Sequence, residues 1–235
     1  MKRTQRILAA LAAVAAAWCM PGAPALHAET HYKPHISIGA RGGMSLSKMT
    51  FSPSVKQSLA GGSTGAVTFR YTEEKIFGLI AELGWVDRGW EENFEDARFS
   101  YSRRLTYIQL PILTHIYFGS RRVKAFINLG PQVAYLVGEK TKANFDYRNP
   151  TKVEGFPYRK RMTEQMSDEI KNRFDYGICA SAGVEFWVQP RHSVYVEGRY
   201  YFGLGNIFPA SKTDTFGASR AMSIEVSLGY NFRIK

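Results

Sequence analysis

The chain has 235 residues and a formal net charge of +11, with 45% hydrophobic and 22% charged residues. This length is enough for one domain of the sandwich or barrel type. The basic residues are spread along the chain and do not gather on one helix, which argues against nucleic acid as a partner. A basic protein of this kind is expected to contact anionic lipid headgroups or glycolipid phosphates at a surface.

The N-terminal segment has the layout of a secretory signal peptide. Basic residues precede an apolar run over residues 7–18, and prolines and small residues follow it. The run is shorter than the roughly 20 residues that a membrane-spanning helix needs. Cleavage after Ala25 and cleavage after Ala28 both fit this pattern. We predict a cleaved signal peptide over residues 1–28 and one exported domain over residues 29–235, with a charge of about +8.

Cysteine usage excludes two kinds of site. Trp18 precedes Cys19 where a lipoprotein signal needs a small residue, so a lipid anchor is disfavoured. Once the leader is removed, Cys179 is the remaining cysteine of the chain. An internal disulfide and a metal site built on paired cysteines are therefore excluded.

Eight stretches of the exported part alternate between apolar and polar residues, as strands with one apolar face do. In the last of them, Ile224, Val226 and Leu228 alternate with Glu225 and Ser227. The predicted strands cover residues 35–46, 64–72, 76–88, 101–118, 122–138, 173–189, 193–205 and 221–234.

The connections between these strands alternate between long and short. They cover residues 47–63, 73–75, 89–100, 119–121, 139–172, 190–192 and 206–220. Outer-membrane barrels have short periplasmic turns and long extracellular loops. The predicted fold is therefore all-β, an eight-stranded antiparallel up-and-down transmembrane β-barrel with both termini on the periplasmic side.

Alternation alone does not distinguish this barrel from a soluble, lipocalin-like one, whose apolar face points inward. Aromatic residues at both ends of the apolar faces favour the membrane barrel, because such barrels carry aromatic girdles at both interfaces. The alternative explanation for these aromatic residues is that they simply have a high propensity for strands. The girdle residues are Tyr71, Phe77, Phe118, Phe186 and Tyr230 at one end, and Trp85, Tyr135, Tyr176 and Phe202 at the other. We predict the outer membrane of a Gram-negative bacterium as the location.

The opposite faces of the predicted strands carry four acids and four bases. These are Arg41, Arg70, Glu82, Lys124, Glu185, Glu197, Arg199 and Glu225. The interior of a small barrel is only wide enough for side chains to fill it, and an unpaired buried charge costs several kcal/mol. We therefore expect a structural network of ion pairs in a plugged lumen, in preference to a proton or cation path.

The long connection over residues 139–172 is the candidate for recognition, since loops on a rigid scaffold often carry function. Aromatic residues are interleaved with seven basic residues in its first part, which are Lys140, Lys142, Arg148, Lys152, Arg159, Lys160 and Arg161. The predicted ligand is an anionic glycan, a glycolipid phosphate or an acidic protein surface. The alternative is a loop kept soluble by its charge. A short helix is expected over residues 162–171.

Residues that could carry chemistry are scarce. His192 and Ser193 are the pair that a lipid-modifying barrel would need, but they lie on a predicted periplasmic turn and not at the outer leaflet. His31 and His35 lack a cysteine or carboxylate that would complete a metal site. His115 is interpreted as an interior histidine. We predict no catalytic residue, no cofactor and no metal, and therefore no enzyme.

Several short segments resemble the PorT-type outer-membrane β-barrel family of Bacteroidota. They are Tyr107–Leu113, Tyr117–Gly119, Ala125–Pro131, Phe174–Gly177, Gly183–Phe186, Val196–Tyr201 and Leu228–Phe232. The resemblance covers nearly all of the exported part and implies an outer-membrane barrel without agreed catalytic residues. The family's namesake takes part in type IX secretion and gliding.

Two hypotheses about function follow. The first is a non-enzymatic barrel with an envelope-structural role or a docking role for ligands or partners through its outer loops. Its expected partners are outer-membrane lipid, lipopolysaccharide and envelope proteins. The alternative is a membrane-anchored component of a type IX secretion or gliding complex, and a lipid-modifying barrel enzyme ranks third.

Overall fold

The computed structural model describes residues 34–73, 76–95, 98–157, 162–211 and 214–234. The predicted signal peptide, residues 1–28, lies outside these ranges, as does His31. Among the residues that are described, no helix has the length and apolar character needed to cross a membrane.

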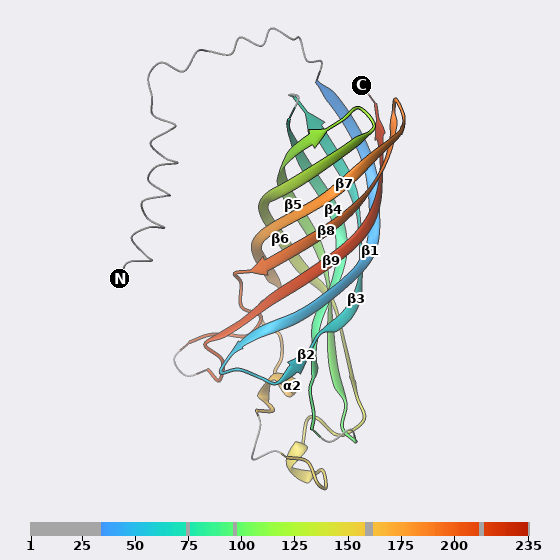
Figure 1. The fold of residues 1–235 in the computed structure, drawn as a ribbon. Coiled ribbons are helices and arrows are strands. Elements are labelled where there is room, and N and C mark those ends of the chain that lie inside the picture. Colours follow the sequence, from blue (N-terminus) through green and yellow to red (C-terminus); the bar gives the residue numbers. More distant parts are fainter. Residues whose placement is uncertain (1–33, 74–75, 96–97, 158–161, 212–213, 235) are drawn as a thin grey trace, which may run out of the picture. The chain divides into compact units, whose positions relative to one another are not determined.

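Eight long strands make up most of the described chain (Figure 1). They are β1 (His35–Ser52), β3 (Ala60–Thr72), β4 (Phe77–Glu92), β5 (Tyr101–Gly119), β6 (Val123–Ala143), β7 (Phe174–Gln189), β8 (His192–Gly203) and β9 (Ala218–Arg233). Three short elements lie between them: β2 (Gln57–Ser58), the 3₁₀-helix η1 (Pro150–Lys152) and the single-turn helix α2 (Glu164–Ser167).

The long strands form one closed antiparallel ring. Each pairs with its neighbours in the chain, and β9 pairs with β1, so that Leu228 lies opposite Gly42. The pairing of β4 with β5 completes the ring, while β2 adds only two residues beside the end of β4. Closure leaves the long strands without a free edge. The predicted eight-stranded up-and-down barrel is confirmed.

The two ends of the barrel differ in the length of their connections. The connections between β3 and β4, between β5 and β6 and between β7 and β8 are short, and they join strand ends where β1 starts and β9 finishes (Figure 1). The connections between β4 and β5, between β6 and β7 and between β8 and β9 are long and join strand ends at the opposite end of the barrel. The alternation of long and short connections is therefore as predicted, and the short turns mark the periplasmic end.

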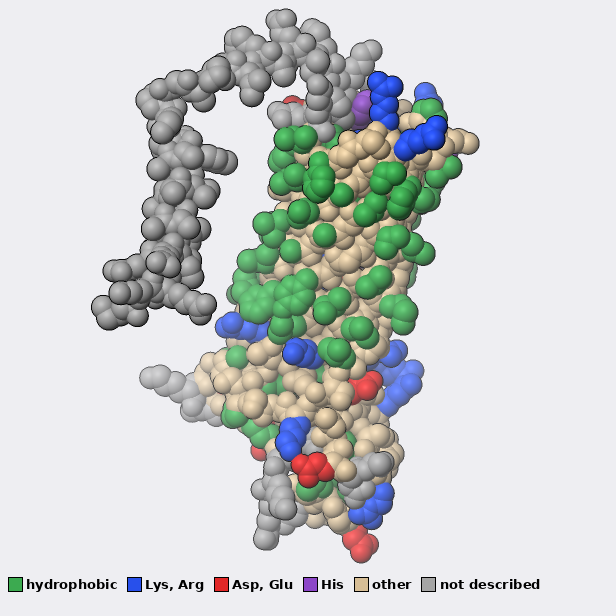
Figure 2. Space-filling model, viewed as in Figure 1, with side chains coloured by type: hydrophobic (Ala, Val, Ile, Leu, Met, Phe, Trp, Pro, Cys, Tyr) green, Lys and Arg blue, Asp and Glu red, His purple; other side chains and the backbone are tan. Residues whose placement is uncertain are grey.

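Large apolar side chains cover the outside of the ring. Val67 is 65% exposed and Leu228 68% exposed, and apolar side chains spread over the upper part of the barrel face that Figure 2 shows. Charged side chains of the same strands are buried inside. In water this arrangement would be costly, because burial of apolar area drives folding. The outward apolar faces therefore belong to a membrane barrel, and the soluble alternative is wrong.

The apolar face changes sides near the long-loop end. In β1, Met44 and Leu46 point outward, whereas Met49 and Phe51, farther along the same strand, are buried inside. In β5, Ile108 points outward, while Leu105 is buried inside. Beyond this level the barrel has an apolar interior and a polar exterior, as a soluble barrel does. The level of the change therefore marks the outer edge of the apolar band.

Several strands run past this edge and are longer than predicted. β1 ends at Ser52 and not at residue 46, β3 begins at Ala60 and not at residue 64, and β6 continues to Ala143. In β1 the apolar residues switch faces beyond Leu46, and the residues added to β3 and β6 are mainly glycine, polar and charged residues, so the apolar alternation predicted a break at these points. The backbone pairing continues regardless, as in Ser47 opposite Ala60. The predicted helix over residues 162–171 is only the single turn of α2.

Candidate functional site

The middle of the lumen holds a cluster of buried ion pairs. Arg199 donates to both carboxylate oxygens of Glu82 at 2.7 and 2.9 Å and to Glu197 Oε1 at 2.8 and 2.9 Å. Arg41 donates to Glu82 Oε2 at 3.0 Å and to Glu225 Oε2 at 3.2 Å. These residues come from β1, β4, β8 and β9, so the cluster crosses the ring. All five side chains are almost completely inaccessible to water.

A second ion pair lies nearer the short turns. Arg70 Nη1 donates to Glu185 Oε1 at 2.9 Å. The same oxygen accepts hydrogen bonds from Ser193 Oγ at 2.7 Å and from Asn231 Nδ2 at 3.1 Å. Three donors therefore surround one carboxylate oxygen, and such hydrogen bonds favour the charged form of a buried acid.

Lys124 faces the lumen beside Glu185 in the register of β6 and β7, but it lies over an aromatic ring. Its Nζ is 4.4 Å from the ring centroid of Tyr117, which is a cation–π distance. The side chain is only half-buried. The structure thus brings seven of the eight predicted lumen charges into ion pairs with one another and places Lys124 at the edge of that network.

Sequence reasoning missed a third group, centred on Arg88. Its Nη2 donates to Gln109 Oε1 at 3.0 Å, and its Nη1 lies 3.5 Å from Asp175 Oδ2. The guanidinium carbon lies 3.8 Å from the ring centroid of Tyr201, whose hydroxyl donates to Asp175 at 2.9 Å. The sequence did indicate that Arg88 faces inward, because it lies an even number of residues along the same strand from the inward Glu82. The predicted strand ended at residue 88, so this position was not considered part of the interior.

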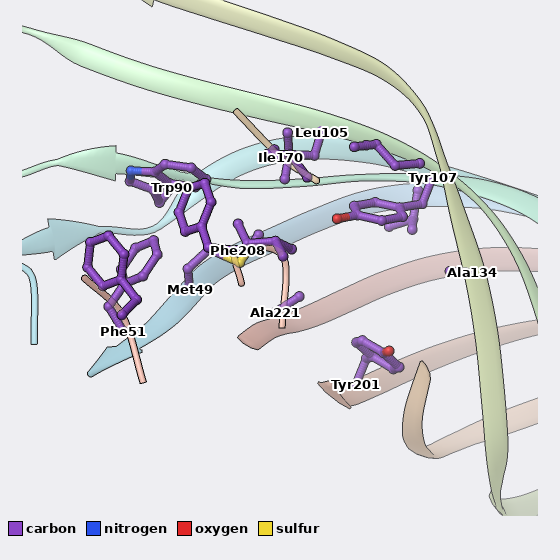
Figure 3. Packing of buried hydrophobic residues seen from close by; sticks show 14 of the residues in the cluster. Met49, Phe51, Trp90, Leu105, Tyr107, Ala134, Ile170, Tyr201, Phe208 and Ala221 are labelled. Atoms are coloured by element: carbon purple, nitrogen blue, oxygen red, sulfur yellow. The ribbon is translucent and has the colours of Figure 1, made fainter. Parts of the chain in front are cut away.

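The long-loop end of the lumen is closed by apolar side chains, which we call the inner cap. Its members are Met49, Phe51, Trp90, Leu105, Met166, Phe208 and Phe216, and all are buried. In Figure 3, Met49, Phe51, Trp90 and Phe208 converge from different strands and loops. Phe51 lies edge-on to Trp90 with 5.4 Å between the ring centroids.

Helix α2 is held inside this mouth of the barrel. The hydroxyl of Tyr101 donates to the carbonyl of Met166 at 2.9 Å. Arg103 Nη1 donates to the carbonyls of Gln165 and Asp168 at 3.1 and 2.8 Å. Burial raises the pKa of the Asp168 carboxyl above its ordinary value, and the nearby Glu164 acts in the same direction. The segment around α2 therefore closes the mouth through specific contacts.

The candidate catalytic pair is not a functional unit. His192 Nδ1 lies 2.5 Å from the hydroxyl of Tyr230. The Ser193 hydroxyl is buried on the other face of β8 and donates to Glu185. His115 lies in the lumen with Nδ1 at 2.6 Å from Asn128 Oδ1. Within the described ranges, no group of three or more His, Cys, Asp or Glu side chains could hold a metal ion.

The seven basic residues predicted for one loop fall into three places. Lys140 and Lys142 lie on the outer face of β6, and their assignment to a loop is wrong because β6 continues past the apolar band. Arg148 lies in the loop, with Cζ 6.0 Å from the Tyr147 ring, and Lys152 lies in η1. The others, Arg159, Lys160 and Arg161, lie outside the described residues.

Lys140 and Lys142 join Arg104 of β5 in what we call the basic cradle. Arg104 lies opposite Lys140 in the register, and Ser102 lies opposite Lys142. These residues line a cavity of about 120 Å³ together with Ala60, Gly61, Glu91 and Arg103. Arg104 Nη2 donates to the carbonyl of Gly61 at 3.0 Å, which holds one side of the cavity. The cradle lies just beyond Ile108, at the outer edge of the apolar band.

The aromatic residues of the long loop are used for packing. Phe145 and Phe156 have ring centroids 5.0 Å apart, and Phe99 lies edge-on to both at 5.6 and 5.2 Å. Phe94 joins the same cluster. The Asn149 side chain and the Arg148 backbone N–H donate to Asp146 and lower its pKa. The loop is therefore folded on itself, and these rings are not presented to a ligand.

Several solved structures of bacterial outer-membrane and surface proteins are similar to this chain. OprG from Pseudomonas aeruginosa is similar with a TM-score of 0.50 and 11% identity, over 84% of this chain and 95% of that one. Neisserial surface protein A matches with a TM-score of 0.42 and 13% identity, over 84% and 96% of the two chains. Ail from Yersinia pestis matches with a TM-score of 0.40 and 10% identity, over 83% and 98%. The likeness to OprG supports the fold alone.

A comparison with curated protein sequences found no significant match. The model of the outer membrane protein beta-barrel domain family matches residues 30–209, which is most of the chain. This match and the fold agree in locating the protein in the outer membrane of a Gram-negative bacterium. The chain therefore belongs to the outer membrane protein beta-barrel domain family.

Proposed function

We propose that the protein is a non-enzymatic barrel with a plugged lumen that binds phosphorylated glycolipid of the outer leaflet at its extracellular rim. The observation that carries this proposal is the basic cradle of Arg104, Lys140 and Lys142 at the outer edge of the apolar band. We therefore expect an envelope-structural role in which the protein acts mainly by docking an anionic ligand.

The filling of the lumen supports a function that does not involve permeation. A solute passing through would have to displace the inner cap and then separate the pairs of Arg199 and Arg41 with their carboxylates. Breaking one buried pair costs about 3–5 kcal/mol. The interior is thus better suited to rigidity than to transport.

The placement of polar groups supports the absence of catalysis. A hydrolytic nucleophile needs a base within hydrogen-bond reach. The Ser193 hydroxyl instead donates to the buried Glu185, on the opposite face of β8 from His192. His115 lies inside the lumen against Asn128, away from any lipid.

The position of the cradle suits a glycolipid that carries phosphate next to acyl chains. On the outer faces of the same two strands, Ile108, Leu110, Tyr135 and Val137 are exposed below the cradle, where they would contact acyl chains. Each cation near an anionic membrane surface contributes about 1 kcal/mol. Together the three cations would strengthen binding by about two orders of magnitude.

Lipid retention in native mass spectrometry tests this proposal. We expect the purified protein to retain lipid A, and a triple Arg104→Gln, Lys140→Gln, Lys142→Gln variant to lose most of it. A double Arg148→Gln, Lys152→Gln variant is the matched control, because it removes loop cations away from the cradle. Heat-modifiability gels establish that all three proteins are folded.

Two further binding measurements identify the chemical group that the cradle binds. Dephosphorylated lipid A should be retained poorly if phosphate is what the cradle binds. One structure of Ail was determined in complex with the heparin analogue sucrose octasulfate, and that compound is a suitable soluble probe here. Binding of the probe without retention of lipid A would mean a glycan ligand. Equal lipid A retention by wild type and the triple variant would contradict the proposal.

The resemblance to the PorT-type family supports a second function, that of a membrane anchor in a type IX secretion or gliding complex of Bacteroidota. The folded loops beyond the apolar band provide a surface on which envelope proteins could assemble. Extraction of the protein in mild detergent followed by identification of stably bound envelope proteins tests it. Recovery of secretion components would support this role, and recovery of the barrel alone would favour the first.

A further inference from the structure

The outer face of the barrel is hollowed where β7, β8, β9 and β1 lie side by side, and we call this hollow the outer groove. Its volume is about 520 Å³, within the range of about 300–1,000 Å³ that is typical of pockets for small ligands. The residues that shape it are Ala40, Gly42, Phe186, Val194, Leu228 and Tyr230. All of them are exposed on the outer faces of their strands, so the groove opens toward lipid and not toward the lumen.

Small residues of β1 leave this space open. Ala40 lies opposite Tyr230 and Gly42 opposite Leu228, so each small residue of β1 stands beside a large one of β9. Apart from chain neighbours, the atom nearest to a Cβ built at Gly42 is the carbonyl oxygen of Thr64 at 4.0 Å. Within a membrane, association depends on close van der Waals packing, and small residues allow such close approach. A concave apolar surface of this kind therefore suits an acyl chain.

The groove lies in the half of the apolar band nearer the short turns. Phe186 and Tyr230 belong to the aromatic girdle predicted for that end, and each is three residues from the end of its strand. Val194 is two residues from the start of β8, and His192 follows it on the same outer face. Nδ1 of His192 lies 2.5 Å from the hydroxyl of Tyr230. These polar atoms close the apolar surface at the depth of the periplasmic interface, where amphipathic aromatic residues are enriched.

Two arginines lie beside the periplasmic end of the groove. Arg191 directly precedes β8, and Arg122 directly precedes β6. The backbone N–H of Trp187, which follows Phe186, donates to the carbonyl of Arg122 at 2.8 Å, and the N–H of Arg233 donates to the carbonyl of Arg191 at 2.8 Å. Their backbones are therefore fixed next to the groove, while the side chains of Arg122 and Arg191 are exposed.

The periplasmic rim is positive on this side of the barrel. Among the described residues, the exposed acid at this end is Glu73, next to the turn between β3 and β4. In the ring, β3 and β4 lie opposite β7 and β8. Glu185 is buried in the lumen, where it pairs with Arg70. Lys and Arg side chains are visible at this end in Figure 2, and such long side chains can reach lipid headgroups.

From this combination we infer that the outer groove binds an acyl chain of an anionic glycerophospholipid of the inner leaflet, with the headgroup at Arg122 and Arg191. A second copy of the chain would fit less well. Two copies share one orientation in the membrane, so a symmetric contact through this face would bring their arginines together, and facing like charges cost energy. The inference does not depend on the proposed glycolipid site, which lies at the other end of the barrel.

Native mass spectrometry with two lipids that carry the same acyl chains tests this inference. The purified protein in detergent is titrated with palmitoyl-oleoyl phosphatidylglycerol, which is anionic, or with the matching phosphatidylethanolamine, whose ammonium group neutralises its phosphate. We expect a complex with one lipid and a preference of about 30-fold for the anionic lipid, which is about fivefold for each of the two arginines. A double Arg122→Gln, Arg191→Gln variant should lose most of this preference.

A Gly42→Leu variant tests the groove itself. The added side chain projects into open space, so the barrel should fold, and it should fill the groove and remove most of the one-lipid complex. Ala81→Leu is the matched control, because it enlarges an outward residue of β4 on the other side of the ring and should bind lipid as the wild type does. Heat-modifiability gels establish that each variant is folded.

Equal affinity for the two lipids, or unchanged binding in Gly42→Leu, would overturn the inference. A protein dimer that is present in wild type and lost in Gly42→Leu would also overturn it, since a second copy would then occupy the groove. The triple Arg104→Gln, Lys140→Gln, Lys142→Gln variant should bind phosphatidylglycerol as wild type does, so the two lipid sites are tested separately. Phosphatidylglycerol with a diazirine in its acyl chain should crosslink to β1, β8 or β9, and crosslinks confined to other strands would contradict the site.

Discussion

Replacing Arg199 with methionine should destabilise the barrel severely. Arg199 is 1% exposed and makes four hydrogen bonds, two to Glu82 and two to Glu197. Methionine fills similar space but leaves both carboxylates with one cation fewer. Removing one partner of a buried ion pair costs about 3–5 kcal/mol, and we expect a loss of this size in the free energy of unfolding.

A second substitution shows whether the cost is electrostatic. In the double variant Arg199→Met, Glu197→Gln, the charge of Glu197 disappears together with its cation, while Arg41 still pairs with Glu82 and Glu225. Replacing a whole buried pair is often close to neutral, so the double variant should recover most of the lost stability. The coupling energy between the two positions should be about 2 kcal/mol or more.

Urea unfolding of protein refolded into lipid vesicles measures these differences, with the folded fraction followed by heat-modifiable migration on gels. Arg148→Met is the control, because this exposed loop cation should change the unfolding free energy by no more than about 0.5 kcal/mol. A cost below about 1 kcal/mol for Arg199→Met would refute the reasoning, since it would mean that water solvates the remaining carboxylates. A double variant as unstable as the single one would refute it as well, because the loss would then come from packing.

Three further outcomes follow from other parts of the barrel. Val226→Arg places a charge on the apolar band and should cost about 2–4 kcal/mol in the same unfolding assay, whereas Val226→Leu should not. Trp90→Ala removes the centre of the inner cap and should cost about 3–5 kcal/mol, yet sugar uptake by vesicles should stay at the wild-type level because the ion pairs below still fill the lumen. The pKa of Asp146 is lowered by hydrogen bonds from Asn149 and Arg148, so its contribution to loop order is present above its ordinary pKa of 3.8 and is lost as the pH falls through the lowered value. The protection of the Arg148 amide, which is the slowing of its exchange relative to the intrinsic rate at the same pH, should therefore fall on acidification in wild type but show no such transition in Asp146→Asn.

The period-two pattern was enough to predict the ring and its facing. Along β9, Ile224 and Val226 point out while Glu225 is fully buried, as parity requires. The pattern works because successive side chains of a regular strand point to opposite faces, and because lipid and lumen impose opposite polarities on these faces. The number of strands and the inward side of the eight predicted lumen charges follow from that rule alone.

The same rule explains what could not be predicted. Beyond Leu46 the inward residues of β1 become Met49 and Phe51, so the alternation reverses its sense and resembles the end of a strand. Pairing of Arg88 with Asp175 could not be predicted either, because parity gives the side of the ring but not which side chains meet across it. The fold of the loop over α2 depends on tertiary contacts such as those of Arg103.

The switch of the apolar residues from the outer to the inner face of the strands also locates the outer edge of the lipid, and this does not depend on any loop. In β5 it falls between Leu105, which is buried inside, and Ile108, which faces out, and the outward positions beyond Ile108 are Thr106 and then Arg104. Lys140, its partner in the register, lies at the same height on β6. A cation two outward positions beyond the last lipid-facing side chain is at the depth of headgroup phosphate. The recognition site was predicted in the long loop over residues 139–172, but the strongest candidate in the structure is on the wall of the barrel. Side chains there are held in place before a ligand arrives, so less entropy is lost on binding.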